Sequence, residues 1–546
     1  MLKKFFQWLR RKKQFYHWLA VAIFLLAAYL RFAHLNWDEG LALHPDERNI
    51  AAAVSRLDWP QKTDPEFYAY NGFPLFLTDI SSQVISYLSN DPSWQTAYGK
   101  INLITRSYSA IFSLITVFFV YLIAKKLFSK KTTLFITFLT ASTVTFIQHA
   151  HFGVTESLLL LEMLILSYLS IQLIETKNKK LILLMAIVSG FSLGTKTTAL
   201  SFMFIPALSI ILTYRWRIKT LLKLIIYVLI SFLFFYLVSP NTFNYLSNFL
   251  ASMKYEQAVV SGQQSVFYTM QFIDTIPYLF QIKTLIWLTS PIILLAAGWG
   301  LFLFLKNIKK YQALWPLMFF SFLYFLYVGS WFTKFNRYLI LVVPSIIFLT
   351  GIALDQCQKK RFGKVAAVVL LLFNGLWAGA FFKIYQNEHV RITASAWIES
   401  NLADQSLILH EERDERLPVI MSNDKNFQYS LLELYQADSL EKIEHLAKQL
   451  AEADYLIIAS QRLFRTIPRS QEHPYTSHYY QLLFAEQLGY QKIREFHAYP
   501  NLLGINIKDE GAEETFRVFD HPSIYIFQNT KQFQQNQLLE MISDLD

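Results

Sequence analysis

The chain has 546 residues, of which 53% are hydrophobic and only 16% are charged. Soluble globular proteins carry about 45–50% apolar and about 25% charged residues, so this composition excludes an ordinary soluble enzyme. The net charge of +10 does not indicate nucleic-acid binding, because Lys and Arg occur in short clusters between long apolar runs, the pattern of cytoplasmic loops.

Apolar runs long enough to cross a bilayer, about 20 residues as a helix, recur along residues 1–385. We expect an α-helical polytopic membrane domain here, with about eleven membrane-spanning helices. The first follows a basic segment and is long enough to remain as a helix rather than a cleaved signal. The predicted spans are residues 15–35, 106–127, a run ending at 149, 156–177, two halves of 181–213 divided near 196–198, 221–238, 284–305, a run ending at 334–337, a run ending at 359–361, and 365–382.

The basic clusters predict the orientation. Each of the five basic clusters follows an even-numbered span. With the N-terminus in the cytoplasm, all five therefore fall on the cytoplasmic side, as the positive-inside rule requires. An odd number of spans then places the C-terminal segment and the loops 36–105 and 239–283 outside a cell (plasma or inner) membrane. The clusters are residues 125–131, 177–180, 215–223, 306–310 and 359–364.

Residues 386–546 change sharply in composition and predict an extracytoplasmic α/β domain. Helix-like runs alternate with short strand-like runs, as in a water-exposed domain. The single Cys357 excludes an intrachain disulfide, so this domain must rely on its own hydrophobic core. The helix-like runs are 392–401, 440–453 and 479–488, and the strand-like runs are 406–410, 455–460 and 524–528.

The outer loop 36–105 holds two acidic pairs, Asp38-Glu39 and Asp46-Glu47. Acids this close repel one another, so one carboxylate could titrate upward, or the four could share a divalent cation such as Mg²⁺ or Mn²⁺. A carboxylate fixed beside the membrane could also act as a general base toward a hydroxyl or an amine. Alternatively, Pro45-Asp46-Glu47 is simply a favourable helix start, with proline and acids in the first turn.

Several cations are predicted at the same outer membrane face. Singly, each could be a residue whose charged end reaches the interface, but together they suit a phosphate anchored in lipid. We therefore expect a transferase that acts on a lipid-linked phosphate substrate. The candidate cations are Arg106 at the start of the second span, Lys196 between the fifth and sixth, and Lys334 and Arg337 between the ninth and tenth.

Other polar residues also lie near this face. Glu156 begins the fourth span, and Gln148, His149 and His151 end the third. Because residues two apart do not share a helix face, the two histidines do not predict a metal site. The aromatic loop 239–283 could pack against the spans, but its length and its Gly262-Gln263-Gln264 break favour amphipathic helices along the membrane that form a mobile flap.

These motifs resemble the GT-C membrane glycosyltransferases, in the branch similar to protein O-mannosyltransferases and aminoarabinose transferases. The resemblance extends over nearly the whole chain. Its most specific parts are an acidic loop motif and a closing motif. The matching residues are Trp37-Asp38-Glu39-Gly40, His44-Pro45-Asp46-Glu47-Arg48, Tyr70-Asn71-Gly72-Phe73-Pro74, Gln148 with His151-Phe152, Gly194-Thr195-Lys196, Ser239-Pro240, Arg337-Tyr338 and Glu514-Thr515-Phe516-Arg517-Val518-Phe519-Asp520-His521-Pro522.

The resemblance implies transfer of a sugar, with inversion, from a polyprenyl-phosphate donor in the membrane to an extracytoplasmic protein, lipid or glycan acceptor. It implies Asp46 as the catalytic base, with Asp38 as the alternative. We expect Glu47, the third catalytic acid, to point elsewhere and to hold a cation or orient the acceptor. Lys196, Arg337, Lys334 and Arg106 would bind the donor phosphate. The family often has Asp where this chain has Glu156. Members of the superfamily differ in whether they need a divalent cation. The implied substrate-binding residues are His44, Arg48, Tyr70, His151 and Glu156.

Two alternative functions are a flippase or transporter of lipid-linked oligosaccharides and a glycan polymerase. Transporters usually place polar sites at the bilayer midplane, often in two repeated halves. This sequence shows no internal repeat and gathers its polar residues at one face, which favours the transferase. A polymerase that joins lipid-linked sugars would share much of the same chemistry.

Overall fold

The computed structural model describes residues 2–358, 361–420 and 425–545, so the basic residues Lys359 and Lys360 lie outside the described part. The chain forms two compact units. The helical unit contains the chain up to Asn36, His44–Glu256 and Tyr278–Phe382. The α/β unit contains Trp37–Leu43, Gln257–Pro277 and the chain from Lys383 onward. The α/β unit thus includes two short segments from the predicted outer loops.

The helical unit confirms a polytopic membrane protein. Seven of its described helical segments are long and apolar enough to span a bilayer, and nine if two bent pairs count as single spans. Two further apolar helices, α8 (Lys180–Thr195) and α16 (Val343–Cys357), are shorter. The long segments comprise α1 (Leu2–Phe32), α4 (Tyr98–Leu127), α7 (Glu156–Thr176), η2 (Thr197–Met203) with α9 (Phe204–Tyr214), α10 (Ile218–Val238), η4 (Gln312–Leu314) with α15 (Trp315–Gly329), and α17 (Arg361–Gln386).

The bent pairs refine two predicted spans. The third span is α5 (Lys130–Ala141) followed by α6 (Val144–His151), with a bend of 46°. The eighth, predicted as one helix over 284–305, is α13 (Leu279–Leu288) followed by α14 (Pro291–Lys306), with a bend of 118°. The break falls at Ser290-Pro291, because proline has no N–H to continue the helix but is favourable at a helix start.

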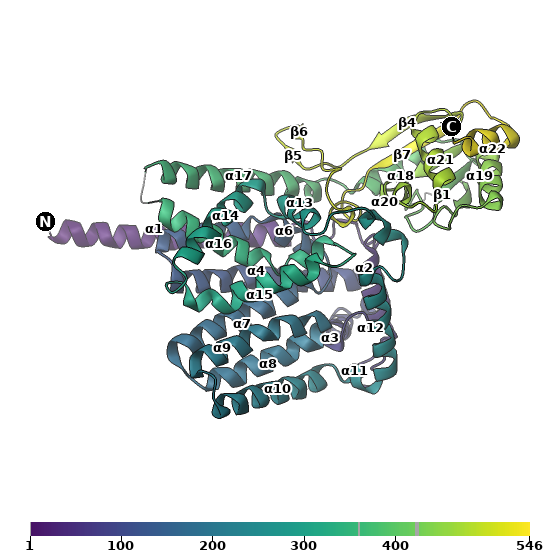
Figure 1. Cartoon of the computed structure of the whole chain (residues 1–546). Coiled ribbons are helices and arrows are strands. Elements are labelled where there is room, and N and C mark those ends of the chain that lie inside the picture. The colour runs from purple at the N-terminus through teal and green to yellow at the C-terminus, as the bar shows by residue number, and fades with distance from the viewer. Residues whose placement is uncertain (1, 359–360, 421–424, 546) are drawn as a thin grey trace. The chain divides into compact units, whose positions relative to one another are not determined.

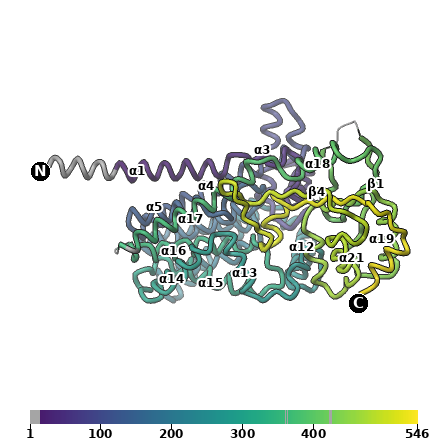
Figure 2. The backbone as a smooth tube through the Cα atoms, turned by 90° about the horizontal axis from the view of Figure 1, so that it is seen from above, coloured from purple at the N-terminus to yellow at the C-terminus, as the bar shows by residue number. Residues whose placement is uncertain are grey.

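Packing in the helical unit follows the connections between neighbouring spans. Helix α8 packs against both α7 and α10 (Figure 1). Helix α16 packs against α5 and α14, and the Asn374 amide of α17 donates to the Ser142 hydroxyl at the end of α5 (2.7 Å), so α5, α16 and α17 lie together (Figure 2). The spans are lipid-facing on their outer surfaces, which explains the many exposed large apolar side chains of α10.

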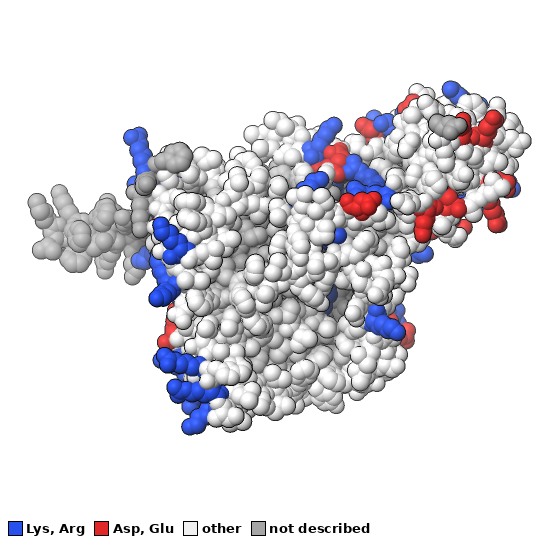
Figure 3. Space-filling model, viewed as in Figure 1, with Lys and Arg blue, Asp and Glu red and all other residues white. Residues whose placement is uncertain are grey.

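One end of the helical unit collects the basic residues (Figure 3). Contacts between the span ends support this grouping: Lys126 of α4 pairs with Glu175 of α7 at 2.6 Å, and the Tyr214 hydroxyl donates to the Lys177 carbonyl at 2.9 Å. The loops that carry the predicted basic clusters 125–131, 177–180 and 215–223 therefore meet at the same end of the bundle.

The outer loops contain short helices of their own. Loop 36–105 forms α2 (Pro45–Val54), α3 (Gly72–Ser89) and η1 (Pro92–Gln95). Loop 239–283 forms α11 (Pro240–Asn244), α12 (Leu246–Ser261) and η3 (Phe267–Phe272). Helix α12 ends at the predicted Gly262 break, where Gly262 has a φ of +81°, a conformation that glycine adopts without a Cβ penalty.

The α/β unit is built on a five-stranded sheet of order β2-β1-β3-β7-β4. Strand β1 (Leu407–Glu411) is parallel to β2 (Gln428–Leu432) and β3 (Tyr455–Ile458), whereas β7 (Ile524–Asn529) is antiparallel to β3 and β4 (Tyr490–Phe496). All four residues of β3 are buried, with Leu456 aligned to Leu409 of β1. The sheet therefore has hydrophobic cores on both faces.

Helices cover both faces of this sheet. One core contains side chains of α19 (Leu440–Glu452), α21 (Pro474–Phe484) and α22 (Gln535–Ser543), and the other those of α18 (Val390–Asn401). The predicted strands 406–410, 455–460 and 524–528 and the helices 392–401 and 440–453 are confirmed. The helix predicted at 479–488 lies at Pro474–Phe484, while the predictions missed β2 and β4, which are the polar edge strands of the sheet. The remaining short elements are α20 (Arg462–Thr466), η6 (Ile467–Arg469), the hairpin β5 (Asn501–Leu502) and β6 (Ile505–Asn506), and η7 (Glu514–Phe516).

Candidate active site

The acidic motif forms the first turn of α2. His44 is the N-cap, and its Nδ1 accepts a hydrogen bond from the Asp46 backbone N–H at 3.2 Å. Pro45 takes the first helical position, and the acids follow in the first turn, where the helix dipole favours negative charge. The capped helix start and the acidic site are therefore the same structure. His44 is buried against Phe152 and serves as a cap.

Glu47 forms a fully buried ion pair with Arg106. The Arg106 Nη2 donates to Glu47 Oε2 at 2.5 Å, Nε lies 3.0 and 3.1 Å from the two oxygens, and both side chains are at most 1% exposed. The Gly153 backbone N–H also donates to Glu47 Oε1 at 2.5 Å. Arg106 lies in the third turn of α4, which begins at Tyr98 rather than at the predicted 106.

This geometry favours a structural role for two residues that the sequence analysis placed in the chemistry. Glu47 was predicted among the catalytic acids and Arg106 among the phosphate-binding cations, but each is enclosed by the other and by backbone groups. Arg106 Nη1 donates to the Leu35 carbonyl at 3.1 Å, which ties the end of the first span to α4. We therefore assign this pair to the fold of the outer loop, and not to binding of a substrate.

Asp46 forms a different kind of pair. Its Oδ2 accepts from Arg337 Nη1 at 2.6 Å, and the side chains are 29% and 30% exposed. Arg337 belongs to η5 (Asn336–Leu339), and its guanidinium lies 5.2 Å from the Phe335 ring centre. Burial lowers the pKa of Arg337, but the Asp46 carboxylate raises it, and the net pKa lies well above its ordinary value. Arg337 thus remains charged and partly accessible.

A second accessible ion pair lies in the same cluster. Lys196, the C-cap of α8, places its Nζ 3.1 Å from Glu156 Oε1 at the start of α7 and 4.8 Å from the Tyr70 ring centre. Lys196 is 19% exposed, whereas Glu156 is 5% exposed. Burial, followed by the charges of Asp46 and Glu156, raises the pKa of Tyr70 well above its ordinary value. Tyr70 therefore stays neutral and can donate a hydrogen bond.

Three predicted motifs build the frame that holds Lys196 and Tyr70. The Asn71 backbone N–H donates to the Thr195 carbonyl at 3.2 Å, and the Gly72 N–H donates to the Ser239 hydroxyl at 2.7 Å. A Cβ on Gly72 would lie 2.1 Å from Asn241 Oδ1, so only glycine permits this approach. The frame therefore unites segments that are more than 160 residues apart in the sequence.

The structure brings together five of the predicted site residues. Tyr70 interacts electrostatically with Asp46, Glu156 and Arg337, and Glu156 interacts with Lys196 and Arg337. The sequence analysis missed two further members, Tyr338 and Glu256 of α12, and both interact electrostatically within this cluster. Glu256 is one of two acids in the loop 239–283, which was the available signal. We call Asp46, Tyr70, Glu156, Lys196 and Arg337 the outer cluster.

Other predicted residues have different environments. The His151 ring nitrogens lie 2.9 Å from the carbonyls of Ile147 and Ala33, so backbone groups hold this ring in place. Lys334 is buried and donates to the Phe332 carbonyl at 2.7 Å, and burial lowers its pKa. These positions do not support the predicted contact of His151 with substrate or of Lys334 with phosphate. Arg48 follows the acids in α2 and is partly exposed.

Asp38 and Glu39 lie in the α/β unit. Asp38 is 1% exposed, and its two oxygens accept from the backbone N–H groups of Gly40 (3.2 Å) and Leu43 (3.0 Å). Glu39 follows with a positive φ of 53°. Both Asp38 oxygens are thus occupied by the turn that Asp38 itself organises, which suits a loop-forming residue better than the predicted alternative base.

The predicted metal ligands do not form a metal site in the described part of the chain. No group of three His, Cys, Asp or Glu residues there could hold a metal ion. Of the four predicted acids, Glu47 is saturated by Arg106 and Gly153, Asp46 is paired with Arg337, and Asp38 binds its own loop. Both oxygens of Glu47 and of Asp38, and one oxygen of Asp46, thus already accept hydrogen bonds from protein groups, which disfavours a divalent cation shared by these acids.

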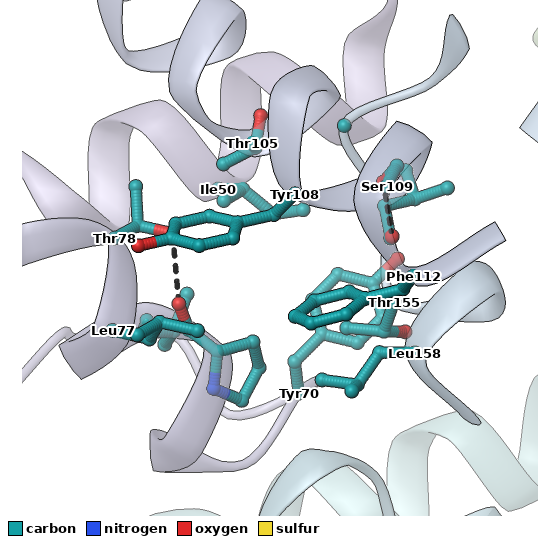
Figure 4. A pocket seen from close by; sticks show the side chains of 14 residues that line it. Ile50, Tyr70, Leu77, Thr78, Thr105, Tyr108, Ser109, Phe112, Thr155 and Leu158 are labelled. Atoms are coloured by element: carbon teal, nitrogen blue, oxygen red, sulfur yellow. Dashed lines mark hydrogen bonds between the residues drawn. The ribbon is translucent and has the colours of Figure 1, made fainter. Parts of the chain in front are cut away.

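A small apolar cavity borders the outer cluster. It has a volume of about 40 Å³, and its wall includes Tyr70, Tyr108, Phe112 and Leu158 (Figure 4). A cavity that holds benzene has about 150 Å³, so this one is too small for a lipid chain. The polyprenyl tail of a donor would have to lie outside it, along the lipid-facing surface of the spans.

Comparison with known proteins agrees with this architecture. Residues 99–243 match the family model described as dolichyl-phosphate-mannose-protein mannosyltransferase. The matched segment contains Glu156 and Lys196 of the outer cluster. The match covers about a quarter of the chain and makes this stretch similar to that family, in line with the predicted resemblance. A search of curated protein sequences finds no significant match.

Two solved structures illustrate the similarity. The archaeal oligosaccharyltransferase AglB from Archaeoglobus fulgidus, in complex with an inhibitory peptide and a dolichol-phosphate, aligns at 13% identity and a TM-score of 0.48, over 92% of this chain and 75% of that chain. ArnT from Cupriavidus metallidurans, bound to undecaprenyl phosphate, aligns at 13% identity and a TM-score of 0.46, over 92% of this chain and 97% of that chain.

Proposed function

We propose that this protein transfers a sugar, with inversion, from a polyprenyl-phosphate donor to an extracytoplasmic acceptor. The observation that carries the proposal is the outer cluster, in which Asp46 and Arg337 form a partly exposed pair beside Lys196, Glu156 and Tyr70. A base and two fixed cations at one place are what this transfer needs. The name of the matched family, which contains a dolichyl-phosphate sugar, supports this class of donor.

The cations would bind the donor phosphate. Arg337 and Lys196 are 30% and 19% exposed, so a ligand can approach them without unfolding the loop. Both now neutralise a carboxylate, and a phosphate would compete for them through charge-assisted hydrogen bonds. Binding of the donor would thus draw Arg337 toward the phosphate and release an oxygen of Asp46 for the acceptor.

The chemical step then follows. The acceptor hydroxyl or amine attacks the anomeric carbon on the face opposite the phosphate, a new bond to the sugar forms, and the bond between the anomeric carbon and the phosphate oxygen breaks. Asp46 takes the acceptor proton. The electron pair stays on the leaving polyprenyl phosphate, whose growing charge is stabilised by Lys196 and Arg337 without solvent reorganisation.

For the orientation, we propose a cytoplasmic N-terminus in the cell membrane, with the α/β unit outside. The meeting of the basic loops at one end of the helical unit (Figure 3) supports this arrangement, because such loops remain on the cytoplasmic side. In a Cys357→Ser background, a cysteine at position 450 should react with an impermeant reagent added outside intact cells, and a cysteine at 308 should not. The reverse pattern would overturn the orientation and the site together.

The test of activity uses the purified protein in lipid nanodiscs with radiolabelled polyprenyl-phosphate sugars. Mass spectrometry of glycolipids and glycoproteins from cells with and without the protein identifies acceptors to add. Transfer should release polyprenyl phosphate and label the acceptor, whereas Asp46→Asn protein should do neither. A flippase would move the intact lipid across the bilayer without releasing phosphate, and this outcome would refute the transferase.

A further inference from the structure

The closing motif of the sequence has no place in the chemistry described above. In the α/β unit, the segment Glu513–His521 does not join the sheet. It instead contacts two segments through which the chain enters or leaves this unit, 257–277 and 383–389. The second of these segments in turn contacts a third, 37–43. We call Glu513–His521 the terminal segment and these three stretches the connectors.

The first connector, 257–277, is held through Gln271. The Gln271 amide donates to Glu513 Oε1 at 2.9 Å, and its Oε1 accepts from the Glu514 backbone N–H at 3.1 Å. Gln271 is 8% exposed and Glu513 is 3% exposed. Both ends of one amide are therefore used, inside the protein, to fix the outer loop to the terminal segment.

The other two connectors meet the same segment. The Tyr385 hydroxyl donates to Asp520 Oδ2 at 2.7 Å, and the His389 Nε2 donates to the Phe519 carbonyl at 3.1 Å. The His389 ring lies 5.4 Å from the Trp37 ring in the remaining connector. The terminal segment is itself braced, because His521 lies between Asp509 (2.9 Å) and Asp520 (2.5 Å).

The outer loop also covers the end of the sheet at which its parallel strands terminate. Phe267 lies 5.3 Å from the guanidinium of Arg462, just beyond β3, and 6.0 Å from that of Arg413, just beyond β1. Its ring is 5.8 Å from that of Tyr435, which follows β2. This is the carboxyl end of the three parallel strands, where open α/β sheets usually bind ligands. Here the chain's own loop occupies it.

The same loop reaches the outer cluster in its first half. Helix α12 is continuous to Ser261 and carries Glu256, which interacts electrostatically with Tyr70 and Tyr338. Only Gly262 and the next few residues separate α12 from the part fixed by Phe267 and Gln271. A free flap, as the sequence suggested, would let Glu256 move away. With its second half fixed, the loop has only the few residues after Ser261 left to move, and this limits the freedom of α12.

We propose that the terminal segment is a clamp whose purpose is to fix the outer loop 239–283, and that acceptor binding, rather than donor binding, depends on it. This inference rests on the proposed function. The donor phosphate contacts Lys196 and Arg337, which lie outside the loop, so releasing the loop leaves them in place. The loop residues Gln271 and Phe267 are therefore positioning residues that act through α12.

The test compares Gln271→Ala with Gln449→Ala. Gln449 is also 8% exposed in the α/β unit, and its amide donates two hydrogen bonds, to the Ser430 hydroxyl (2.7 Å) and the Leu431 carbonyl (2.8 Å), none of them to a connector. Gln271→Ala loses its two bonds to the terminal segment and a third to the Tyr268 carbonyl (3.2 Å), and Gln449→Ala loses two, so both variants should be destabilised to a comparable extent. In Gln271→Ala only, KM for the acceptor should rise about tenfold, the effect of about 1.4 kcal/mol, with KM for the donor unchanged.

Limited proteolysis provides a readout that does not need activity. Cleavage within 257–277 should become faster in Gln271→Ala and remain as in the wild type in Gln449→Ala. Equal cleavage in both variants, or equal acceptor KM values, would overturn the clamp. If the wild-type protein shows no transfer at all, the proposed function fails, while the proteolysis comparison still decides whether the terminal segment fixes the loop.

Discussion

Asp46 and Glu47 are neighbours in one turn of α2 and both bind an arginine, yet their environments are opposite. The Glu47–Arg106 pair is at most 1% exposed and is completed by a backbone N–H, whereas the Asp46–Arg337 pair is about 30% exposed on each side. Consecutive helical residues point about 100° apart. One acid therefore faces the core of the outer loop, and the other faces the open cluster.

This difference separates a structural charge from a chemical one. A buried pair contributes little net stability, but removing one partner leaves an uncompensated charge. An exposed pair is easily exchanged for another ligand, because water screens it and each partner can move. The accessible pairs are thus the places where a phosphate or an acceptor can enter, and the following experiments test that division.

The largest effect is expected for Arg106→Ala. It strands the Glu47 carboxylate in the core, which should destabilise the protein by about 3–5 kcal/mol and abolish folded material in detergent. Size-exclusion chromatography and thermal melting measure this loss. A double variant, Glu47→Leu with Arg106→Leu, should recover folded protein. If Arg106→Ala folds normally but no longer binds donor, Arg106 is a phosphate ligand after all.

Asp46→Asn should spare the fold and remove the chemistry. The amide keeps the shape and one acceptor oxygen for Arg337 but cannot take a proton, so kcat should fall by roughly 10²–10⁴ while the donor still binds. Asp38→Asn should have a smaller effect, because Asp38 is enclosed by its own loop. Full activity of Asp46→Asn together with an inactive Asp38→Asn would transfer the role of base to Asp38.

Lys196→Ala and Arg337→Ala should weaken donor binding. A hydrogen bond to a charged group contributes about 1.5–3 kcal/mol, so donor affinity should fall by roughly 10- to 100-fold. The melting temperature should stay near normal in Arg337→Ala and fall somewhat in Lys196→Ala, which leaves the buried Glu156 without this partner. Donor binding is measured directly with a fluorescent polyprenyl phosphate. Lys334→Ala is the matched control, because its ammonium binds the Phe332 carbonyl. Equal losses in all three variants would place the phosphate elsewhere.

The last effect concerns stability alone and involves a buried acid that is not paired with an arginine. Glu411 of β1 is 3% exposed and accepts from the Tyr480 hydroxyl at 2.6 Å. Burial, with Asp414 and Glu412 nearby, raises its pKa from 4.5 to about 8. Because the folded state then holds a proton that the unfolded state loses, stability falls by about 1 kcal/mol per pH unit between pH 5 and pH 8.

Glu411→Gln should remove this slope. The glutamine resembles the protonated acid and does not titrate, so the variant should lose less stability than the wild type on going from pH 6 to pH 8. Hydrogen exchange of β1 and β3 measures the opening free energy of the α/β unit in the intact protein. Parallel slopes in the two proteins would show that Glu411 is ionised in the folded state.

Sequence reasoning identified the accessible cluster better than the buried pair. Lys196 and Arg337 were predicted from their places at the outer ends of apolar runs, and Asp46 from the acidic motif of the outer loop. All of these are local features. Arg106 was placed at the start of its span, whereas α4 begins eight residues earlier than the apolar run, at Tyr98. Polar residues in the first turns of a span carry no hydropathy signal, so the true start was hidden.

The loop 239–283 shows a similar division. The end of α12 at Gly262 was predictable, because glycine marks a break in the chain. The attachment of Gln271 to Glu513 was not, since these residues are 242 positions apart. The aromatic composition of this segment suggested a membrane surface, whereas in the structure Phe267 lies on side chains that follow strands of the α/β unit.

By itself, the sequence determined that the chain is a multi-pass membrane protein, and it located the apolar spans, the capped start of α2 and most strands and helices of the α/β core, because each depends on the period and composition of a short stretch. Only the tertiary structure decided which acid meets which cation. Glu47 and Arg106 are 59 residues apart, and Asp46 and Arg337 are 291 apart. Such pairs form when packed helices bring distant turns together, and no local pattern records which turns will meet.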